Sequence, residues 1–386
     1  MGEDNGYETI IGLEVHAQLL TESKMFCGCS TEYQNTPPNT HVCPVCLGMP
    51  GSLPVANRSA IECVMATALA LHCEIPEHTR FDRKNYFYPD LMKGYQISQY
   101  DAPIGRNGWV DIEVSGARKH IGITRVHLEE DVAKSFHMGS YSLIDVNRSG
   151  VPLMETVSEP DIRSPEEARE YLVRLRSLLR YLGVSSGNME EGSFRCDANI
   201  SVRKRGAPDF GAKVEVKNMN SFRGVYRALQ YEQQRQVQAL EEGGLLRQET
   251  RGWIDEEGIT VAQRSKEYAD DYRYFPEPDL PPLVLSRSWV EDVDTRMPEL
   301  PEARIERYTS TCGLSRQDAM TLVDTRSLAD FFDSTVAMTG EPKARTVCNW
   351  LLGDMSRLIN ADAIEICDCA VTPRSLSELL DLIAKG

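Results

Sequence analysis

The sequence predicts an α+β protein, with a sheet-rich first domain followed by an all-helical second domain. Up to about residue 275, segments that alternate apolar and polar residues are mixed with helical patterns, and from about residue 295 onward the pattern is helical. Between these regions, YFPEPDLPPL (274–283) contains four prolines, which remove amide donors and interrupt helices. The 386 residues are enough for two or three domains, and we expect domains at 1–293 and 294–386.

The first predicted strand is IGLEVHAQL (11–19). Its odd positions are apolar, and its even positions present Glu14, His16 and Gln18 on one face. A polar stripe of this kind often faces water on an antiparallel sheet and needs no function. A functional interpretation therefore requires matching stripes on other strands.

Later segments repeat the pattern of one apolar and one acidic face. They are TRVHLEEDVAK (124–134), SLIDVNRSGVPLMETVSEPD (142–161), RCDANISVRKR (195–205) and GAKVEVKN (211–218). Their polar faces carry Glu129, Glu155, Asp197 and Glu215, and Asp145 and Asn147 alternate with apolar neighbours in the second segment. RGAPDFG (205–211) is predicted to be the hairpin loop between the last two strands.

These carboxylates predict a bound cation, because like charges on one sheet face repel each other. Mg²⁺ takes carboxylate oxygens and carries nucleotide phosphates, and the interspersed arginines and lysines would hold phosphates. The sequence has neither a Walker A loop nor a kinase glycine loop. We therefore predict a phosphoryl-transfer site on an open antiparallel sheet, with a plain solvated sheet as the alternative. His127 and His137 are left out of this site, since single histidines are more often structural.

The helices are predicted to be structural. We expect three helices in the first domain. The first spans about 57–72, the second begins at Ser164 with a capping box to Glu167 and ends at Gly183, and the third runs from near Ser221 to Gly243. In the second domain we expect helices in RSLADFFDSTVAM (326–338), EPKARTVCNWLLGDMSRLI (341–359) and TPRSLSELLDLIAKG (372–386).

Four cysteines predict a structural zinc knuckle at 27–46. CGCSTEYQNTPPNTHVCPVC contains a C-x-C pair and a C-x-x-C pair, which are Cys27, Cys29, Cys43 and Cys46. Two close pairs suit tetrahedral Zn²⁺ with four thiolates and no open position. The alternatives are unpaired core cysteines or a redox pair at Cys43 and Cys46.

Composition restricts the class of protein. The formal net charge of −16 argues against a general nucleic-acid coat, although a local basic patch would still bind RNA. The eleven cysteines are an odd number, which argues against a disulfide framework. The start is polar and no apolar run reaches 18 residues, so we expect a cytoplasmic protein.

A further segment, RKNYFYPDLMKGYQISQYDAP (83–103), mixes aromatic residues with Lys84 and Lys93. This mixture suits either nucleotide or RNA binding or an ordinary packed loop.

Several of these motifs together resemble the B subunit of the aspartyl/glutamyl-tRNA(Asn/Gln) amidotransferase, the GatB family. The resemblance rests on IGLEVHAQL, the C-x-C and CPVC pairs, KNYFYPDLMKGYQISQ, HLEEDVAK, DVNRSGVPLMETVSEPDIRS and VEVKNMNS. It extends from about residue 8 to about residue 283 and continues more weakly through the helical region.

The resemblance implies a ligase that forms a carbon–nitrogen bond and acts only with its partners. ATP would phosphorylate the side-chain carboxylate of Glu-tRNA(Gln) or Asp-tRNA(Asn). Ammonia that the amidase A subunit releases from glutamine would then displace the phosphate, within a heterotrimer completed by a small C subunit. It also implies a glutamine-synthetase-like cradle fold for the sheet domain.

The resemblance also implies roles for individual residues. Glu14, His16 and Glu129 match the family's Mg²⁺ site, with Glu155 and Glu215 nearby, and Asp197 joins them as a further site residue. His16 is either a metal ligand or a group that orients a water molecule, and Gln18 receives no role.

The sequence departs from the family pattern in two places. Val146 stands where many members have an aromatic residue, which we interpret as a packing change. The tail domain that normally follows is absent after Gly386, so we expect a truncated chain or an unusual member with weaker tRNA binding. Two alternative functions remain: a stand-alone ATP-dependent carboxylate–ammonia ligase, and a zinc-stabilised tRNA-binding scaffold without catalysis.

Overall fold

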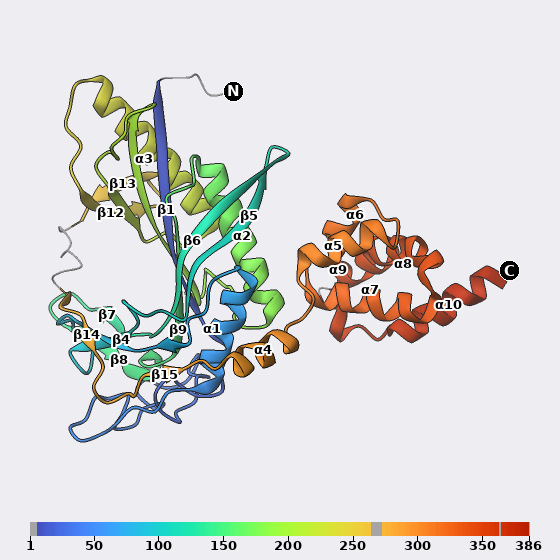
Figure 1. Cartoon of the computed structure of the whole chain (residues 1–386), viewed down its shortest axis with the longest axis horizontal. Coiled ribbons are helices and arrows are strands. Elements are labelled where there is room, and N and C mark those ends of the chain that lie inside the picture. The colour runs from blue at the N-terminus through green and yellow to red at the C-terminus, as the bar shows by residue number, and fades with distance from the viewer. Residues whose placement is uncertain (1–5, 264–271, 363, 386) are drawn as a thin grey trace. The chain divides into compact units, whose positions relative to one another are not determined.

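The computed structural model describes residues 6–263, 272–362 and 364–385, and its largest sheet has eight strands, all from the part of the chain before residue 263 (Figure 1). In spatial order its strands are β13 (Ile259–Ala262), β12 (Glu249–Ile254), β11 (Val214–Lys217), β10 (Phe194–Lys204), β1 (Tyr7–Gln18), β9 (Pro152–Ser158), β6 (Ala117–Glu130) and β5 (Gly105–Val114). The mixed α+β class predicted from the sequence is confirmed.

One pair of strands departs from the predicted antiparallel sheet. Strands β11 and β12 run parallel, whereas the other neighbouring pairs are antiparallel. Helix α3 (Phe222–Glu241) lies between them in the chain and supplies the crossover that parallel strands need.

The alternation of β1 separates the two faces of the sheet. Ile11, Leu13 and Val15 are at most 1% exposed, and they share their face with Thr9, which accepts a hydrogen bond from Gln233 of α3 at 2.8 Å. The helices therefore cover the apolar face, and the opposite face with Glu14 and His16 is left for a site.

Three helices besides α3 belong to this part of the chain. They are α1 (Arg58–Ala70), α2 (Pro165–Leu182) and α4 (Arg287–Arg296). The predicted first turn of α2 forms, because the amide of Glu167 donates to Ser164 Oγ at 3.2 Å and the Glu167 carboxylate accepts from the amide of Arg163 at 2.7 Å. Helix α1 contacts β5 and β6, and α3 contacts β10 and β13.

Shorter strands form three small sheets. These are β14 (Phe275–Pro276), β3 (Asp82–Asn85) and β4 (Tyr95–Ser98); β15 (Leu283–Val284) with β2 (His78–Thr79); and β7 (Lys134–His137) with β8 (Ser142–Asp145).

The segment around Asp145 and Asn147 differs from its predicted place in the main sheet. Among the strands that the structure describes, β8 pairs with β7 alone, and residues Val146–Arg148 form a 3₁₀ turn. Asp145 Oδ1 accepts from the amide of Asn147 at 3.0 Å, a local bond that competes with strand pairing. Strand pairing with the main sheet resumes at Pro152, so Glu155 lies in that sheet.

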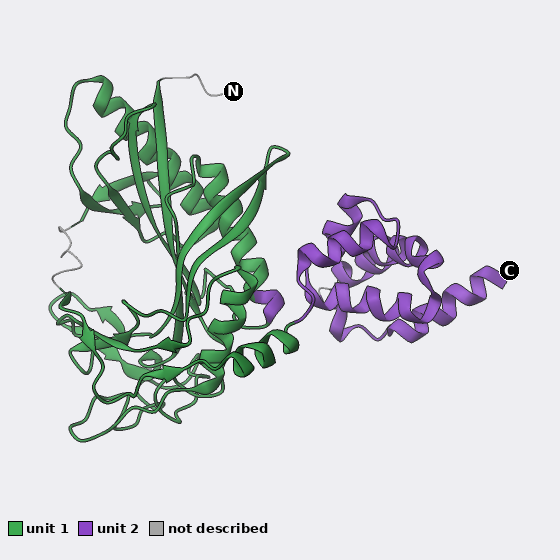
Figure 2. Ribbon diagram, viewed as in Figure 1, with its two compact units in different colours: residues 1–179, 183–297 green, residues 180–182, 298–386 purple. Residues whose placement is uncertain are grey.

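The described residues group into two compact units (Figure 2). The first takes residues up to 179 and 183–297, and the second takes 180–182 and 298–385. The second unit contains α5 (Pro301–Ser310), α6 (Arg316–Leu322), α7 (Arg326–Thr339), α8 (Ala344–Trp350), a π turn (Leu351–Met355), α9 (Ser356–Asp362) and α10 (Pro373–Lys385).

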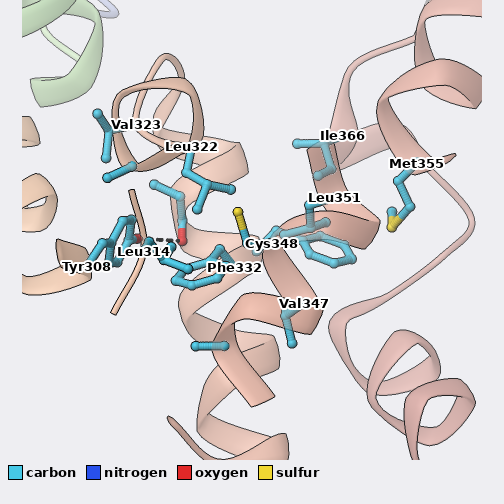
Figure 3. Close-up of a cluster of buried hydrophobic side chains, with 14 of the residues drawn as sticks. Tyr308, Leu314, Leu322, Val323, Phe332, Val347, Cys348, Leu351, Met355 and Ile366 are labelled. Carbon is cyan, nitrogen blue, oxygen red and sulfur yellow. Dashed lines mark hydrogen bonds between the residues drawn. The ribbon is translucent and has the colours of Figure 1, made fainter. Parts of the chain in front are cut away.

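Buried aromatic and aliphatic side chains hold the second unit together (Figure 3). The rings of Tyr308 and Phe332 meet edge to face at 4.7 Å, with Leu322, Val347 and Leu351 in the same cluster. Among the helices that the structure describes, none has both the length and the apolar composition needed to cross a bilayer.

Candidate active site and metal centres

A row of polar side chains crosses the middle of the large sheet. Arg195 on β10 lies opposite His16 on β1, His16 lies opposite Glu155 on β9, and Glu155 lies opposite His127 on β6. Two residues before His16 on β1, Glu14 lies opposite Asp197 on β10. The separate stripes of the sequence therefore lie side by side on one face.

Three of these groups meet at one point. His16 Nε2 lies 3.5 Å from Glu129 Oε1 and 3.6 Å from Glu155 Oε2. Candidate ligand atoms of His16, Glu129 and Glu155 all lie within 4.8 Å of one another, the spacing of groups that share one ion. Both carboxylates are buried, so their charges are shielded little by solvent.

His127 completes this cluster. Its Nε2 atom lies 3.1 Å from Glu155 Oε2 and 3.9 Å from Glu129 Oε2, and its side chain is 3% exposed. Burial alone would raise the pKa of Glu155, but His127 and His16 hold that pKa well below its usual range. In turn, Glu155 and Glu129 raise the pKa of His127 against the opposing effect of burial.

The other predicted site residues lie in the same cavity with different partners. Glu14 Oε1 accepts a hydrogen bond from Asn199 Nδ2 at 2.9 Å. Lys217 Nζ bonds to Asp197 and lies 3.3 Å from Glu215 Oε1. Thr250 Oγ1 donates to Glu215 Oε2 at 3.0 Å. Among the described residues, the structure therefore gathers three of the five predicted Mg²⁺ ligands at one point.

The cavity above the sheet has a volume of about 1020 Å³, and its other wall is cationic and aromatic. Lys84 Nζ lies 4.9 Å from the centre of the Tyr272 ring, and the rings of Tyr100 and Tyr274 stack at 4.3 Å. Glu129 and Glu155 raise the pKa of Lys84, although burial opposes them, so this lysine stays charged. The cavity lining includes Lys84, Tyr86, Gln96, Gln99 and Tyr100 from segment 83–103.

Two cations that line the cavity, Lys84 of this wall and Arg125 of strand β6, have no anionic partner among the residues that the structure describes. Within the described part of the chain, neither Lys84 nor Arg125 forms an ion pair, and the buried Arg125 Nε has no hydrogen-bond acceptor. In contrast, Lys93 Nζ from the same segment lies 2.5 Å from Glu130 Oε1. Lys84 and Arg125 are therefore cations of the cavity that remain for an anionic ligand.

Sequence reasoning missed His127, Arg125, Tyr272 and Tyr274. His127 and Arg125 stand two and four positions before Glu129 on one strand, so the alternation itself contained the signal. The two tyrosines reach the cavity because β14 pairs with β3, which places Phe275 opposite Arg83. No local pattern predicts that pairing. His137 is exposed on β7 and bonds Ser142 Oγ at 3.0 Å, outside the cavity.

The four cysteines of segment 27–46 form a second cluster. Candidate sulfur atoms of Cys27, Cys29, Cys43 and Cys46 lie within 4.8 Å of one another, and the Cys43 and Cys46 sulfurs are 3.8 Å apart. Tetrahedral Zn²⁺ with bonds of about 2.3 Å separates its sulfurs by about 3.8 Å, so this donor set fits zinc. A hydrogen bond from Cys27 lowers the pKa of Cys46 to about 4, and burial raises that of Cys29 to about 11.

Comparison with known proteins gives consistent matches along the chain. Residues 9–291 match a family model described as the GatB/GatE catalytic domain, and residues 330–386 match one described as the GatB domain. The B subunit of the aspartyl/glutamyl-tRNA(Asn/Gln) amidotransferase of Dehalococcoides mccartyi (strain CBDB1) is 57% identical, over 98% of this chain and 80% of that protein. The B subunits of the same name from Thermomicrobium roseum and Brevibacillus brevis are 56% and 55% identical, over 98% of this chain and 79% of each.

Proposed function

This chain belongs to the family of aspartyl/glutamyl-tRNA(Asn/Gln) amidotransferase B subunits, and we propose that its cavity activates the side-chain carboxylate of a misacylated tRNA with ATP. As a member, it is one component of a tRNA-dependent amidotransferase, a ligase that forms a carbon–nitrogen bond together with partner subunits. Family membership therefore favours this function over a stand-alone ligase and over a scaffold without catalysis.

The convergence of His16, Glu129 and Glu155 supports the proposal most directly. These residues would hold Mg²⁺, with Glu14, Glu215 and Asp197 near it in the cavity. The carboxylate oxygens suit Mg²⁺, whereas imidazole is a less common Mg²⁺ ligand and suits Mn²⁺ better. When bound, the ion supplies positive charge that offsets the charge of the nucleotide phosphates. His127 would hold Glu155 in the orientation that the ion needs.

Lys84 and Arg125 would contact the phosphoryl oxygens. Phosphoryl transfer requires positioning and charge stabilisation more than a protein nucleophile. The two cations line the cavity without an ion pair among the described residues, and they share it with the Glu129 cluster. They are therefore free to neutralise charge that develops on the phosphoryl group.

The chemistry explains why ATP is needed. A carboxylate is a poor electrophile, so its oxygen first attacks the γ-phosphorus of ATP, which forms an acyl phosphate and releases ADP. The ammonia nitrogen then attacks the carbonyl carbon, the carbon–oxygen bond to phosphate breaks, and a proton is lost from nitrogen. The products are Gln-tRNA(Gln) or Asn-tRNA(Asn), phosphate and ADP. We assign ammonia release to an amidase A subunit, and the bridging role in the heterotrimer to a small C subunit.

Two structural roles complete the proposal. The large sheet acts as a glutamine-synthetase-like cradle, on whose polar face the carboxylate is phosphorylated and aminated. The four cysteines hold a structural Zn²⁺, which leaves no open coordination position for catalysis.

The test is ADP formation by the chain assembled with its partner subunits. We expect ADP to form with ATP, Mg²⁺, ammonium chloride and Glu-tRNA(Gln) or Asp-tRNA(Asn), and to fall to background in Glu129→Ala. Ammonium chloride bypasses glutamine hydrolysis, so the result depends on this cavity. Turnover with free glutamate instead of aminoacyl-tRNA would favour a stand-alone ligase, and no turnover with any substrate would favour a scaffold.

A further inference from the structure

A series of hydrogen bonds joins the loop between the two cysteine pairs to the cavity wall. The Tyr33 hydroxyl lies 3.3 Å from Gln18 Oε1, to which it donates. Gln18 Nε2 donates to Asp131 Oδ2 at 2.7 Å, and Arg195 Nη2 lies 3.0 Å from the same oxygen. We call this series the Tyr33–Arg195 chain of hydrogen bonds.

Asp131 is the fixed point of this chain. Its side chain is 1% exposed, its Oδ1 accepts from the amide of Val132 at 2.9 Å, and its own amide donates to Val151 O at 2.8 Å. A buried carboxylate with these partners stays in one orientation. The guanidinium that it holds is therefore also restricted.

Arg195 is the end of the chain that faces a ligand. It lies opposite His16 in the pairing of β10 and β1, it lines the cavity, and its side chain is 37% exposed. A guanidinium has five N–H donors, and Asp131 does not use all of them. The remaining donors lie on the same cavity as the His16 cluster.

The other end of the chain lies in a tethered loop. Tyr33 lies between Cys29 and Cys43, and the same loop bonds to Asn147 in the 3₁₀ turn. Asn147 Nδ2 donates to Pro37 O at 2.9 Å, and Asn147 Oδ1 accepts from the amide of His41 at 2.8 Å. The loop is thus held to the 3₁₀ turn at two points, Pro37 and His41.

We propose that Gln18 and Asp131 are positioning residues that aim the Arg195 guanidinium at a phosphoryl group of ATP, and that Tyr33 connects them to the cysteine loop. The inference rests on the proposed function, because that function places ATP in this cavity. It gives Gln18, the third polar residue of the first strand, a role beside Glu14 and His16.

The test is a double-mutant cycle on ATP affinity, measured by calorimetry on the assembled complex. We expect Asp131→Asn and Gln18→Leu to weaken ATP binding about tenfold and Tyr33→Phe about threefold, as for loss of hydrogen bonds that support a charged group. In an Arg195→Gln background the same changes should have no further effect, because the group they position is gone. Tyr141→Phe, an exposed tyrosine on the β7–β8 hairpin, is the matched control.

Thermal melting of each variant separates positioning from stability. The inference would be overturned if each change weakened ATP binding by the same factor in the Arg195→Gln background as in the wild type. It would also be overturned if Gln18→Leu and Tyr33→Phe left ATP affinity unchanged. The latter two variants decide the matter even if Asp131→Asn does not fold. A wild-type complex that binds ATP without forming ADP would overturn the proposed function alone, since the cycle reads binding and not turnover.

Discussion

His127 Nε2 lies 3.1 Å from Glu155 Oε2, and the two residues face each other across the pairing of β6 and β9. This contact places a buried imidazole next to a carboxylate that also lies 3.6 Å from His16 Nε2. In the metal site that we propose, Glu155 is a ligand, and His127 would affect metal affinity by orienting Glu155 without contacting the ion.

His127→Asn should therefore weaken Mn²⁺ and Mg²⁺ binding by about tenfold, because Glu155 loses the group that orients it. Calorimetric titration of the purified chain with each ion measures this. His137→Asn is the matched control, since His137 is exposed on the β7–β8 hairpin. Equal affinities in His127→Asn and the wild type would exclude a supporting role for His127.

Lys84→Met should weaken ATP binding by about tenfold and leave ADP binding within about twofold, because the lost charge would face the terminal phosphate. Arg125→Gln should show the same selectivity. Fluorescence titration with both nucleotides measures the ratio of dissociation constants. Lys204→Met changes an exposed lysine outside the cavity and serves as control. Equal losses of affinity for ATP and ADP would mean that these cations contact a part of the nucleotide other than the terminal phosphate.

The cysteine cluster should bind one zinc ion per chain, which elemental analysis of the purified protein measures. Cys46→Ser should remove the metal and lower the melting temperature by several degrees, because the loop between the pairs loses its central tether. Cys367→Ser is the control, since Cys367 is exposed and outside the cluster. A protein that lacks metal and melts at the wild-type temperature after Cys46→Ser would show that the thiols serve no structural ion.

Strict alternation made the strands of the site predictable from the sequence. β1 and β10 follow a two-residue period, so the common face of Glu14, His16 and Asp197 follows from the pleat. Thr124 interrupts this register on β6, where pairing shifts between Ile123 and Arg125, but Glu129 and His127 lie beyond the shift. His127 is left out of the predicted site because single histidines are more often structural, although its position on the strand places it on the same face as Glu129.

Contacts between distant segments were not predictable in this way. Asp145 and Asn147 alternate with apolar residues as a strand does, yet Asp145 bonds the amide of Asn147 and that of Asn39, 106 residues away. Such side-chain bonds compete with strand pairing and leave no periodic signal. The aromatic wall of the cavity depends in the same way on the pairing of β14 with β3.

A buried ion-pair network behind the sheet predicts how stability depends on pH. Glu232 of α3 is 0% exposed and lies 2.8 Å from Arg235 Nη2 and 3.1 Å from Arg251 Nε. Burial alone would raise the pKa of Glu232, but Arg235, Thr260 and Gln236 lower it below 4.5. The ionised carboxylate therefore stabilises the fold fully above pH 4.5, and this contribution is lost as the pH falls through the folded pKa.

Glu232→Gln should accordingly lower the free energy of unfolding by about 2 kcal/mol at pH 7, because the two arginines lose a buried charged acceptor. The arginines retain Glu249, whose Oε1 lies 3.0 Å from Arg251 Nη1, which limits the loss. Urea denaturation at pH 7 and at pH 3.5 should show the difference from wild type shrinking at the lower pH. Glu256→Gln, at an exposed position, should change neither value. A difference that stays constant across this range would mean that packing of Glu232, and not its charge, stabilises the contact between α3 and the sheet.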